Sequence, residues 1–312
     1  MSDYLWDKSG EPDPEVQRLE ELLSPFAMKK APLRFPERRR WRPLLVVAAS
    51  VAVITAAVTF WYVRRPHGPA WEVVAIGGNG GARQLTDGGV VETNGSSRAR
   101  LEMSTFGHVE LEPNTKLKLL VTKSDEQRMA LSRGKIHALI WAPPGQFVVN
   151  TPSAVTVDLG CSYTLEVDLL GDSIVRVSFG WVAFEDHGRE SFIPATAMCK
   201  TRPNHGPGIP VYEDAPYELQ KGVDVFDGNG DLKAAEAILR SARPRDAMTV
   251  WHLLRRVPDA QRGEVYDRLS QLIHLPDDVT RDQVVRGDTR AIEEIWNSLG
   301  LGDMAWWRMW KR

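Results

Sequence analysis

Residues 44–63 of this 312-residue chain read LLVVAASVAVITAAVTFWYV and contain no charged side chain. A helix of that length rises about 30 Å, which matches the hydrocarbon core of a bilayer. Trp41, Trp61 and Tyr62 stand at its two ends, where aromatic rings prefer the headgroup level. The run predicts one transmembrane helix. A buried helix of a soluble protein and a cleaved signal peptide are the alternatives; the length of the run disfavours the first, and its bulky end disfavours the second.

Lysine and arginine residues predict the direction in which the chain crosses the bilayer. Only Arg64 and Arg65 closely follow the run, whereas residues 29–43 before it contain seven basic residues: Lys29, Lys30, Arg34, Arg38, Arg39, Arg40 and Arg42. Positive side chains stay on the cytoplasmic side. We therefore expect residues 1–43 in the cytoplasm and residues 66–312 in the periplasm, taking the source as bacterial and the bilayer as the inner membrane. The main topology determinants in this prediction are Arg38, Arg39, Arg40 and Arg42.

The two cysteines, Cys161 and Cys199, both lie beyond the apolar run. In an oxidising compartment two cysteines most simply form one disulfide. Cys161 and Cys199 are therefore disulfide candidates, and two free buried thiols are the alternative.

Residues 66–200 predict a mainly β domain. Apolar and polar residues alternate in RARLEM, TKLKLLV, KIHALI and YTLEV, which is the pattern of half-buried strands. On this pattern Leu117, Leu119 and Val121 share one buried face. Turn residues such as Asn94-Gly95 and Pro143-Pro144-Gly145 separate the strands. Many short strands in series predict a sandwich or a solenoid-like stack.

Four segments of this β region, in this order, carry a family resemblance: DGGVVETNGSSRARLEMSTFGHVELEPNTKLKLL, LSRGKIHALI, FVVNTPSAVTVDLGCSYTLEV and VRVSFGWVAF. Together with the single span before them, they resemble the FecR domain family over roughly residues 71–195. The resemblance implies regulation across the inner membrane. Members of the family are similar to anti-sigma factors or sigma regulators, with a short cytoplasmic part, one span and a periplasmic β domain that receives a signal.

The C-terminal part predicts helices. A Pro- and Gly-rich segment, residues 201–217, reads as a linker. Beyond it, residues 218–312 predict an all-α bundle, with Asp231 and Asp288 as helix caps and Gly300 as a helix stop. The chain ends in WWRMWKR, and this tryptophan cluster fits packing against the bundle, an anchor for a partner or contact with a membrane surface.

The sequence offers no catalytic or metal-binding motif. Its seven histidines are not paired at metal-ligand spacing. DGNGD begins like a calcium loop, but Leu232 and Ile238 occupy the positions that need glycine and glutamate. The formal net charge of −2 argues against nucleic acid as a partner. We therefore expect no enzyme activity, no cofactor and no metal.

The N-terminal segment predicts a partner-binding helix. Residues 1–28 hold seven acidic and two basic side chains. Asp13 precedes Pro14 as a helix cap, and the apolar residues that follow fall on roughly one face. A helix this short is marginal alone in water, which favours folding on a partner's groove over a solvated tail that lies back on the membrane. The candidate partner-binding residues are Tyr4, Leu5, Trp6, Val16, Leu19, Leu23 and Phe26.

These observations favour a single-pass regulator of an extracytoplasmic-function sigma factor, which would be its cytoplasmic partner. A periplasmic or outer-membrane protein would supply the signal, and the lipid bilayer would hold the chain. The alternative is a membrane-tethered periplasmic binding or envelope-assembly protein without a sigma-factor role.

Overall fold

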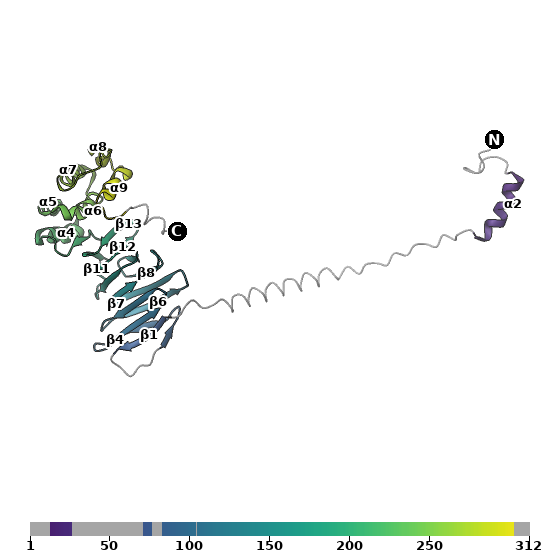
Figure 1. Ribbon diagram of the computed structural model, residues 1–312, viewed down its shortest axis with the longest axis horizontal. Helices are drawn as coiled ribbons and strands as arrows, with labels where there is room; N and C mark the ends of the chain where they lie inside the picture. Colours follow the sequence, from purple (N-terminus) through teal and green to yellow (C-terminus); the bar gives the residue numbers. More distant parts are fainter. Residues whose placement is uncertain (1–12, 27–70, 77–82, 104, 303–312) are drawn as a thin grey trace. The chain divides into compact units, whose positions relative to one another are not determined.

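The computed structural model describes residues 13–26, 71–76, 83–103 and 105–302 (Figure 1). The chain divides into two compact units, Met1–Arg65 and Pro66–Arg312, and each is described here by itself. The predicted span at 44–63 lies outside the described residues. Among the residues described, no helix combines the length and apolar character needed to cross a membrane.

In the first unit the described residues form helix α2 (Pro14–Leu23), followed by a short 3-10 turn, η1 (Ser24–Phe26). Asp13 caps α2, since its side chain accepts a hydrogen bond from the Glu15 amide, and Pro14 occupies the first helical position. The helix therefore begins where the sequence predicts.

Strands of the second unit form two sheets that share the long strand β7 (Gln127–Ile140). The first sheet also contains β1 (Trp71–Ile76), β2 (Arg83–Leu85), β4 (Arg98–Met103), β5 (Gly107–Leu111), β10 (Ser162–Val167), β11 (Ser173–Phe179), β14 (Ala197–Arg202), β15 (Gly206–Pro207) and β16 (Val211–Tyr212). The second contains β3 (Val90–Glu92), β6 (Lys116–Thr122), β8 (Phe147–Asn150), β9 (Val155–Asp158), β12 (Trp181–Asp186) and β13 (Arg189–Pro194).

Apolar faces of the two sheets pack together. Trp71 of the first sheet contacts Phe147 of the second, with ring centroids 6.2 Å apart, and its indole N–H donates to Gln127 at 2.8 Å. Strand β7 passes from one sheet to the other at Gly134, which adopts φ +94°. A Cβ at that position would overlap Thr115, so the crossing needs glycine.

The predicted alternation is confirmed in most strands. In β4, β7 and β10 the expected inward residues are buried. Strand β6 differs after Leu119, where a register shift leaves Val121 partly exposed and turns Thr122 inward. A bulge of this kind adds one residue and exchanges the two faces beyond it.

Helices follow the strands in the second unit, as Figure 1 shows from green to yellow. They are α4 (Tyr217–Asn229), α5 (Leu232–Ser241), α6 (Ala247–Leu254), α7 (Arg262–Leu272), α8 (Arg281–Val285) and α9 (Thr289–Ser298). Asp231 and Asp288 cap α5 and α9, and Gly300 follows the end of α9 with φ +68°. The helical region and these caps were predicted. The sequence pattern indicated four helices, which correspond to α5, α6, α7 and α9, so α4 and α8 were not predicted.

The structure corrects the predicted linker at 201–217. This segment contains the end of β14 and the strands β15 and β16, and Ile209, Val211 and Tyr212 within it are buried. Proline and glycine serve here as edge-strand and turn residues, not as a flexible connection. The β and helical regions consequently belong to one compact unit, Pro66–Arg312, without a linker between them.

The structure also corrects the predicted disulfide, because Cys161 and Cys199 are both free and buried. Cys161 precedes β10, Cys199 lies in β14, and β11 runs between these two strands. Two strand spacings already separate the cysteines by about 10 Å, and a disulfide needs Cα atoms within about 7 Å. The prediction was wrong for this geometric reason.

Candidate functional site

Helix α2 presents the apolar face that the sequence predicts for partner binding. Leu19, Leu23 and Phe26 are 57%, 60% and 84% exposed, and Val16 is partly exposed. Val16, Leu19 and Leu23 share one side of the helix at 100° per residue, and Phe26 follows in η1. Tyr4, Leu5 and Trp6 lie outside the described residues, as do the predicted topology determinants Arg38, Arg39, Arg40 and Arg42.

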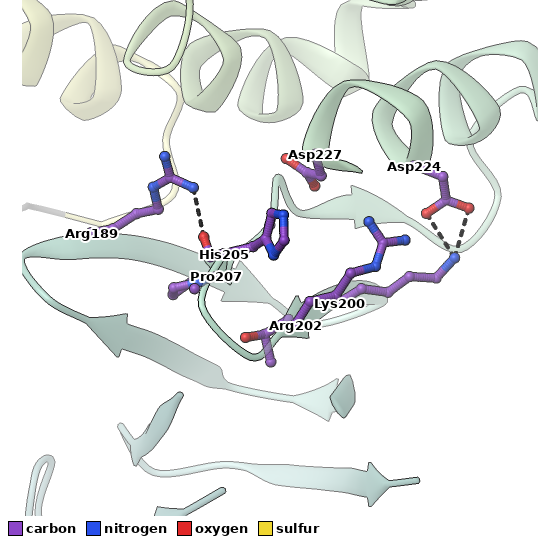
Figure 2. Close-up of a pocket in the computed structure, with 10 residues that line it drawn as sticks. Arg189, Lys200, Arg202, His205, Pro207, Asp224 and Asp227 are labelled. Carbon is purple, nitrogen blue, oxygen red and sulfur yellow. Dashed lines mark hydrogen bonds and ion pairs between the residues drawn. The ribbon is translucent and has the colours of Figure 1, made fainter. Parts of the chain in front are cut away.

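In the second unit, a polar depression lies where β13, β14 and β15 meet α4 (Figure 2). Lys200 reaches across to both carboxylate oxygens of Asp224 at 2.7 Å. Arg189 donates to the carbonyl oxygen of His205 at 2.8 Å. The space inside the depression is about 10 Å³, enough for about one water molecule. Its charged groups therefore hold the strands and α4 together.

Arg256 contacts two residues that line this depression, Pro207 and Gly208, and only 6% of its side chain is exposed. Its guanidinium donates to the carbonyl oxygen of Pro207 at 2.6 Å and to Ser191 Oγ at 2.7 Å, and it lies 4.0 Å from Asp227 Oδ1. Burial lowers the pKa of Arg256 to about 10, against the opposing effect of Asp227, so the group remains charged at neutral pH. Burial raises the pKa of Asp227, and the positive charge of Arg256 acts in the opposite direction.

An aromatic cluster joins the helices to β13. Trp296 packs against Trp251 at 4.7 Å and against Phe192 at 5.5 Å between ring centroids. His252 Nε2 accepts from the amide of Phe192 at 3.1 Å, and its Nδ1 lies 2.9 Å from the carbonyl oxygen of Met248. Burial lowers the pKa of His252 well below its usual value. A neutral, fully bonded imidazole fits a packing role.

A second buried carboxyl lies at the turn between β9 and β10. Asp158 accepts from the thiol of Cys161 at 2.6 Å and from the amide of Gly160 at 2.7 Å. Burial raises the pKa of Asp158 to about 7, while these hydrogen bonds act in the opposite direction. The Tyr163 hydroxyl is buried and has no hydrogen-bond partner in this part of the structure.

Asp227 was considered only as the first residue of the rejected calcium loop DGNGD, and the sequence patterns did not single out Arg256 or Asp158. Each was one charged residue in an otherwise ordinary helical or strand pattern, and only the packing of distant segments shows that it is buried. Within the described ranges, no group of three His, Cys, Asp or Glu side chains is placed to hold a metal ion.

Comparison with known proteins identifies the β region. The family model described as FecR protein matches residues 89–183. Two crystal structures of a "putative anti-sigma factor" from Parabacteroides distasonis ATCC 8503 are similar, with 15% and 16% sequence identity and a TM-score of 0.36. The similarity covers 43% of this chain and 63% of each of theirs. Likeness at this level supports no statement about what this chain does. Among curated proteins, none matches the sequence.

Proposed function

We propose that this chain, which carries a FecR domain at residues 89–183, is a single-pass regulator of the bacterial inner membrane. It acts as an anti-sigma factor or sigma regulator for an extracytoplasmic-function sigma factor. The FecR domain receives a signal from a periplasmic or outer-membrane protein, and residues 1–43 bind the sigma factor in the cytoplasm. Its role is binding, not catalysis.

The observation that carries this proposal is the exposed apolar face of α2 in a chain with a FecR domain. Leu19, Leu23 and Phe26 are large side chains that water surrounds in the unit described. Burying one such side chain stabilises a complex by about 1.5–3 kcal/mol. A ten-residue helix is marginal alone in water, so a partner that covers this face also stabilises the helix.

Charge supports a basic binding surface on the partner. Residues 1–28 hold seven acidic side chains against Lys8 and Arg18. Complementary charge speeds association and selects among partners more than it adds affinity. A sigma factor, which binds DNA, offers basic surfaces of this kind.

Sequence supports the membrane topology in the proposal. The uncharged run at 44–63 has the length of a span, and the basic residues before it favour a cytoplasmic N-terminus. One chain then exposes the α2 face on one side of the bilayer and the FecR domain on the other.

The test measures binding of the full-length chain, in detergent, to each extracytoplasmic-function sigma factor of the source organism. Leu19→Asp and Leu23→Asp should each weaken the complex at least tenfold, because a carboxylate enters the apolar contact at a cost above 1.4 kcal/mol. Gln17→Asp adds the same charge on the opposite side of α2 and should leave the affinity near that of the parent.

Equal weakening by all three variants would contradict a contact through the apolar face. Failure of the parent chain to bind any of these sigma factors would contradict the sigma-regulator role itself. The chain would then be better described as a membrane-tethered periplasmic binding or assembly protein.

A further inference from the structure

Three exposed apolar side chains gather at one end of the first sheet. Leu139, Trp141 and Phe179 are 41%, 56% and 71% exposed. Leu139 lies opposite Ser162 in β10, and Ser162 lies opposite Phe179 in β11. Leu139, Ser162 and Phe179 therefore form one row across neighbouring strands. Trp141 follows Leu139 by two residues, so the two side chains point to the same face of the sheet. The Trp141 ring packs against His108, with ring centroids 6.4 Å apart. We call Leu139, Trp141 and Phe179 the apolar row.

The chain enters the second unit at this same end. Glu72, the second residue of β1, pairs with Glu102, which pairs with His108, which pairs with Leu139. The start of β1 is therefore in register with the apolar row.

Chain length ties this end to the predicted span. Seven residues separate Val63, the last residue of the apolar run, from Trp71, the first of β1. An extended chain covers at most about 3.4 Å per residue, so Trp71 lies within roughly 30 Å of the end of the span. A span at 44–63 would therefore leave the apolar row within reach of the outer surface of the bilayer.

The described part of the chain ends, at Gly302, near the apolar row. Trp181 follows Phe179 by two residues, and its ring packs against Trp296 at 6.1 Å. The Trp296 indole N–H donates to the carbonyl oxygen of Gly302 at 2.9 Å. Beyond Gly302 the sequence contains three tryptophans and three basic residues, a composition that suits a membrane interface: Trp306, Trp307, Trp310, Arg308, Lys311 and Arg312.

We propose that Leu139, Trp141 and Phe179 insert into the headgroup region of the bilayer and hold the FecR domain against the membrane. This proposal rests on the proposed function, because it needs the span at 44–63. Exposed aromatic rings with apolar neighbours are the side chains that lipid headgroups accommodate best.

Charge at this end indicates the kind of lipid surface. The register row that contains Leu139 and Phe179 also contains Glu72 and Glu102, and it has no lysine or arginine among its six residues. Glu102 is already paired with Arg100 at 2.8 Å, so the row has no excess of positive charge to attract anionic headgroups. The apolar row should therefore enter a zwitterionic surface without help from anionic lipid.

The experiment places a nitroxide label on the full-length chain in phosphatidylcholine vesicles. Phe179→Cys carries the label in the apolar row. Leu170→Cys is the matched control, because Leu170 is also an exposed apolar residue but lies at the tip of the β10–β11 hairpin, about 20 Å farther along the strands. The native thiols are buried and should not react.

Collisions of each label with oxygen and with a water-soluble nickel complex report its depth. We expect the label at 179 to lose nickel collisions and gain oxygen collisions relative to the label at 170. Adding Leu139→Ser and Trp141→Ser to Phe179→Cys should return the label to the nickel accessibility of the control.

Three results would overturn the proposal. Equal nickel accessibility of both labels, on a chain that floats with the vesicles, would leave the span intact and remove the membrane contact. Dipolar broadening at 179 without a gain in oxygen collisions would show that a second copy of the chain covers the row. A chain that does not float with the vesicles would remove the span, and with it both this proposal and the proposed function.

Discussion

Asp158 is a side chain whose ionisation should affect stability near neutral pH. Its folded pKa of about 7 lies above the unfolded value near 3.8, so the folded state holds a proton that the unfolded state releases. The stability that this proton contributes is fully present below about pH 4 and is lost as pH rises through about 7. The total change is about 4 kcal/mol.

Asp158→Asn removes this titration and keeps an oxygen to accept the hydrogen bond from the Gly160 amide. The free energy of unfolding of the parent should fall between pH 5 and pH 8 by more than that of the variant. Denaturant titrations at several pH values measure both slopes, and parallel slopes would contradict the raised pKa.

Arg256 is the residue that should contribute most to the junction between strands and helices. Arg256→Met leaves Asp227 and two buried carbonyl groups without their cationic partner, which costs about 3–5 kcal/mol. Arg240→Met is the matched control, because Arg240 on α5 is exposed and pairs with Glu236 on the surface of the helix. Thermal unfolding of the two variants should differ clearly, and equal melting temperatures would show that Arg256 is not structural.

Strand β7 depends on one glycine for its passage between the two sheets. Gly134→Ala places a methyl group against the Thr115 backbone at a positive φ, and it should lower the free energy of unfolding by about 3 kcal/mol. At Gly95 the nearest atom to an added Cβ is 3.6 Å away and φ is not positive. Gly95→Ala should therefore unfold at a denaturant concentration close to that of the parent; an equal effect of both substitutions would be the contrary result.

For individual helices and strands, local sequence patterns predicted the features that depend on neighbouring residues, namely the buried strand faces and the helix starts. Alternation predicted the inward faces of β4, β7 and β10, and capping residues predicted the starts of α2, α5 and α9. Val121 was misplaced because a bulge leaves no mark in an alternating pattern. Helix α8 was missed although Thr280 and Gln283 form a capping box, a signal that the sequence does contain.

Long-range contacts were beyond sequence reasoning. Proline and glycine at 201–217 resemble a linker, yet the strands there pair with β14, which comes just before them in the chain. The disulfide between Cys161 and Cys199 was predicted only from the expected oxidising compartment. The strand order shows that β11 separates the two cysteines. The exposed face of α2 was predicted, since a short capped helix carries its own pattern, whereas the buried Arg256 was not.

For the whole molecule, we propose that one chain joins an apolar helix face to a FecR domain across a bilayer. The predicted span supplies the connection, and the apolar row would fix how the FecR domain meets the membrane. Binding of a sigma factor at α2 and reception of a signal by the FecR domain both require these two units to lie in different compartments.

Cysteine accessibility in spheroplasts tests this arrangement most directly. Glu21→Cys places a thiol on α2 and Asp277→Cys places one on an exposed loop of the second unit, while both native thiols are buried. A membrane-impermeant maleimide should label Asp277→Cys in intact spheroplasts and Glu21→Cys only after lysis. Labelling of both variants before lysis, or of neither, would place the two units on the same side of the membrane and contradict the account.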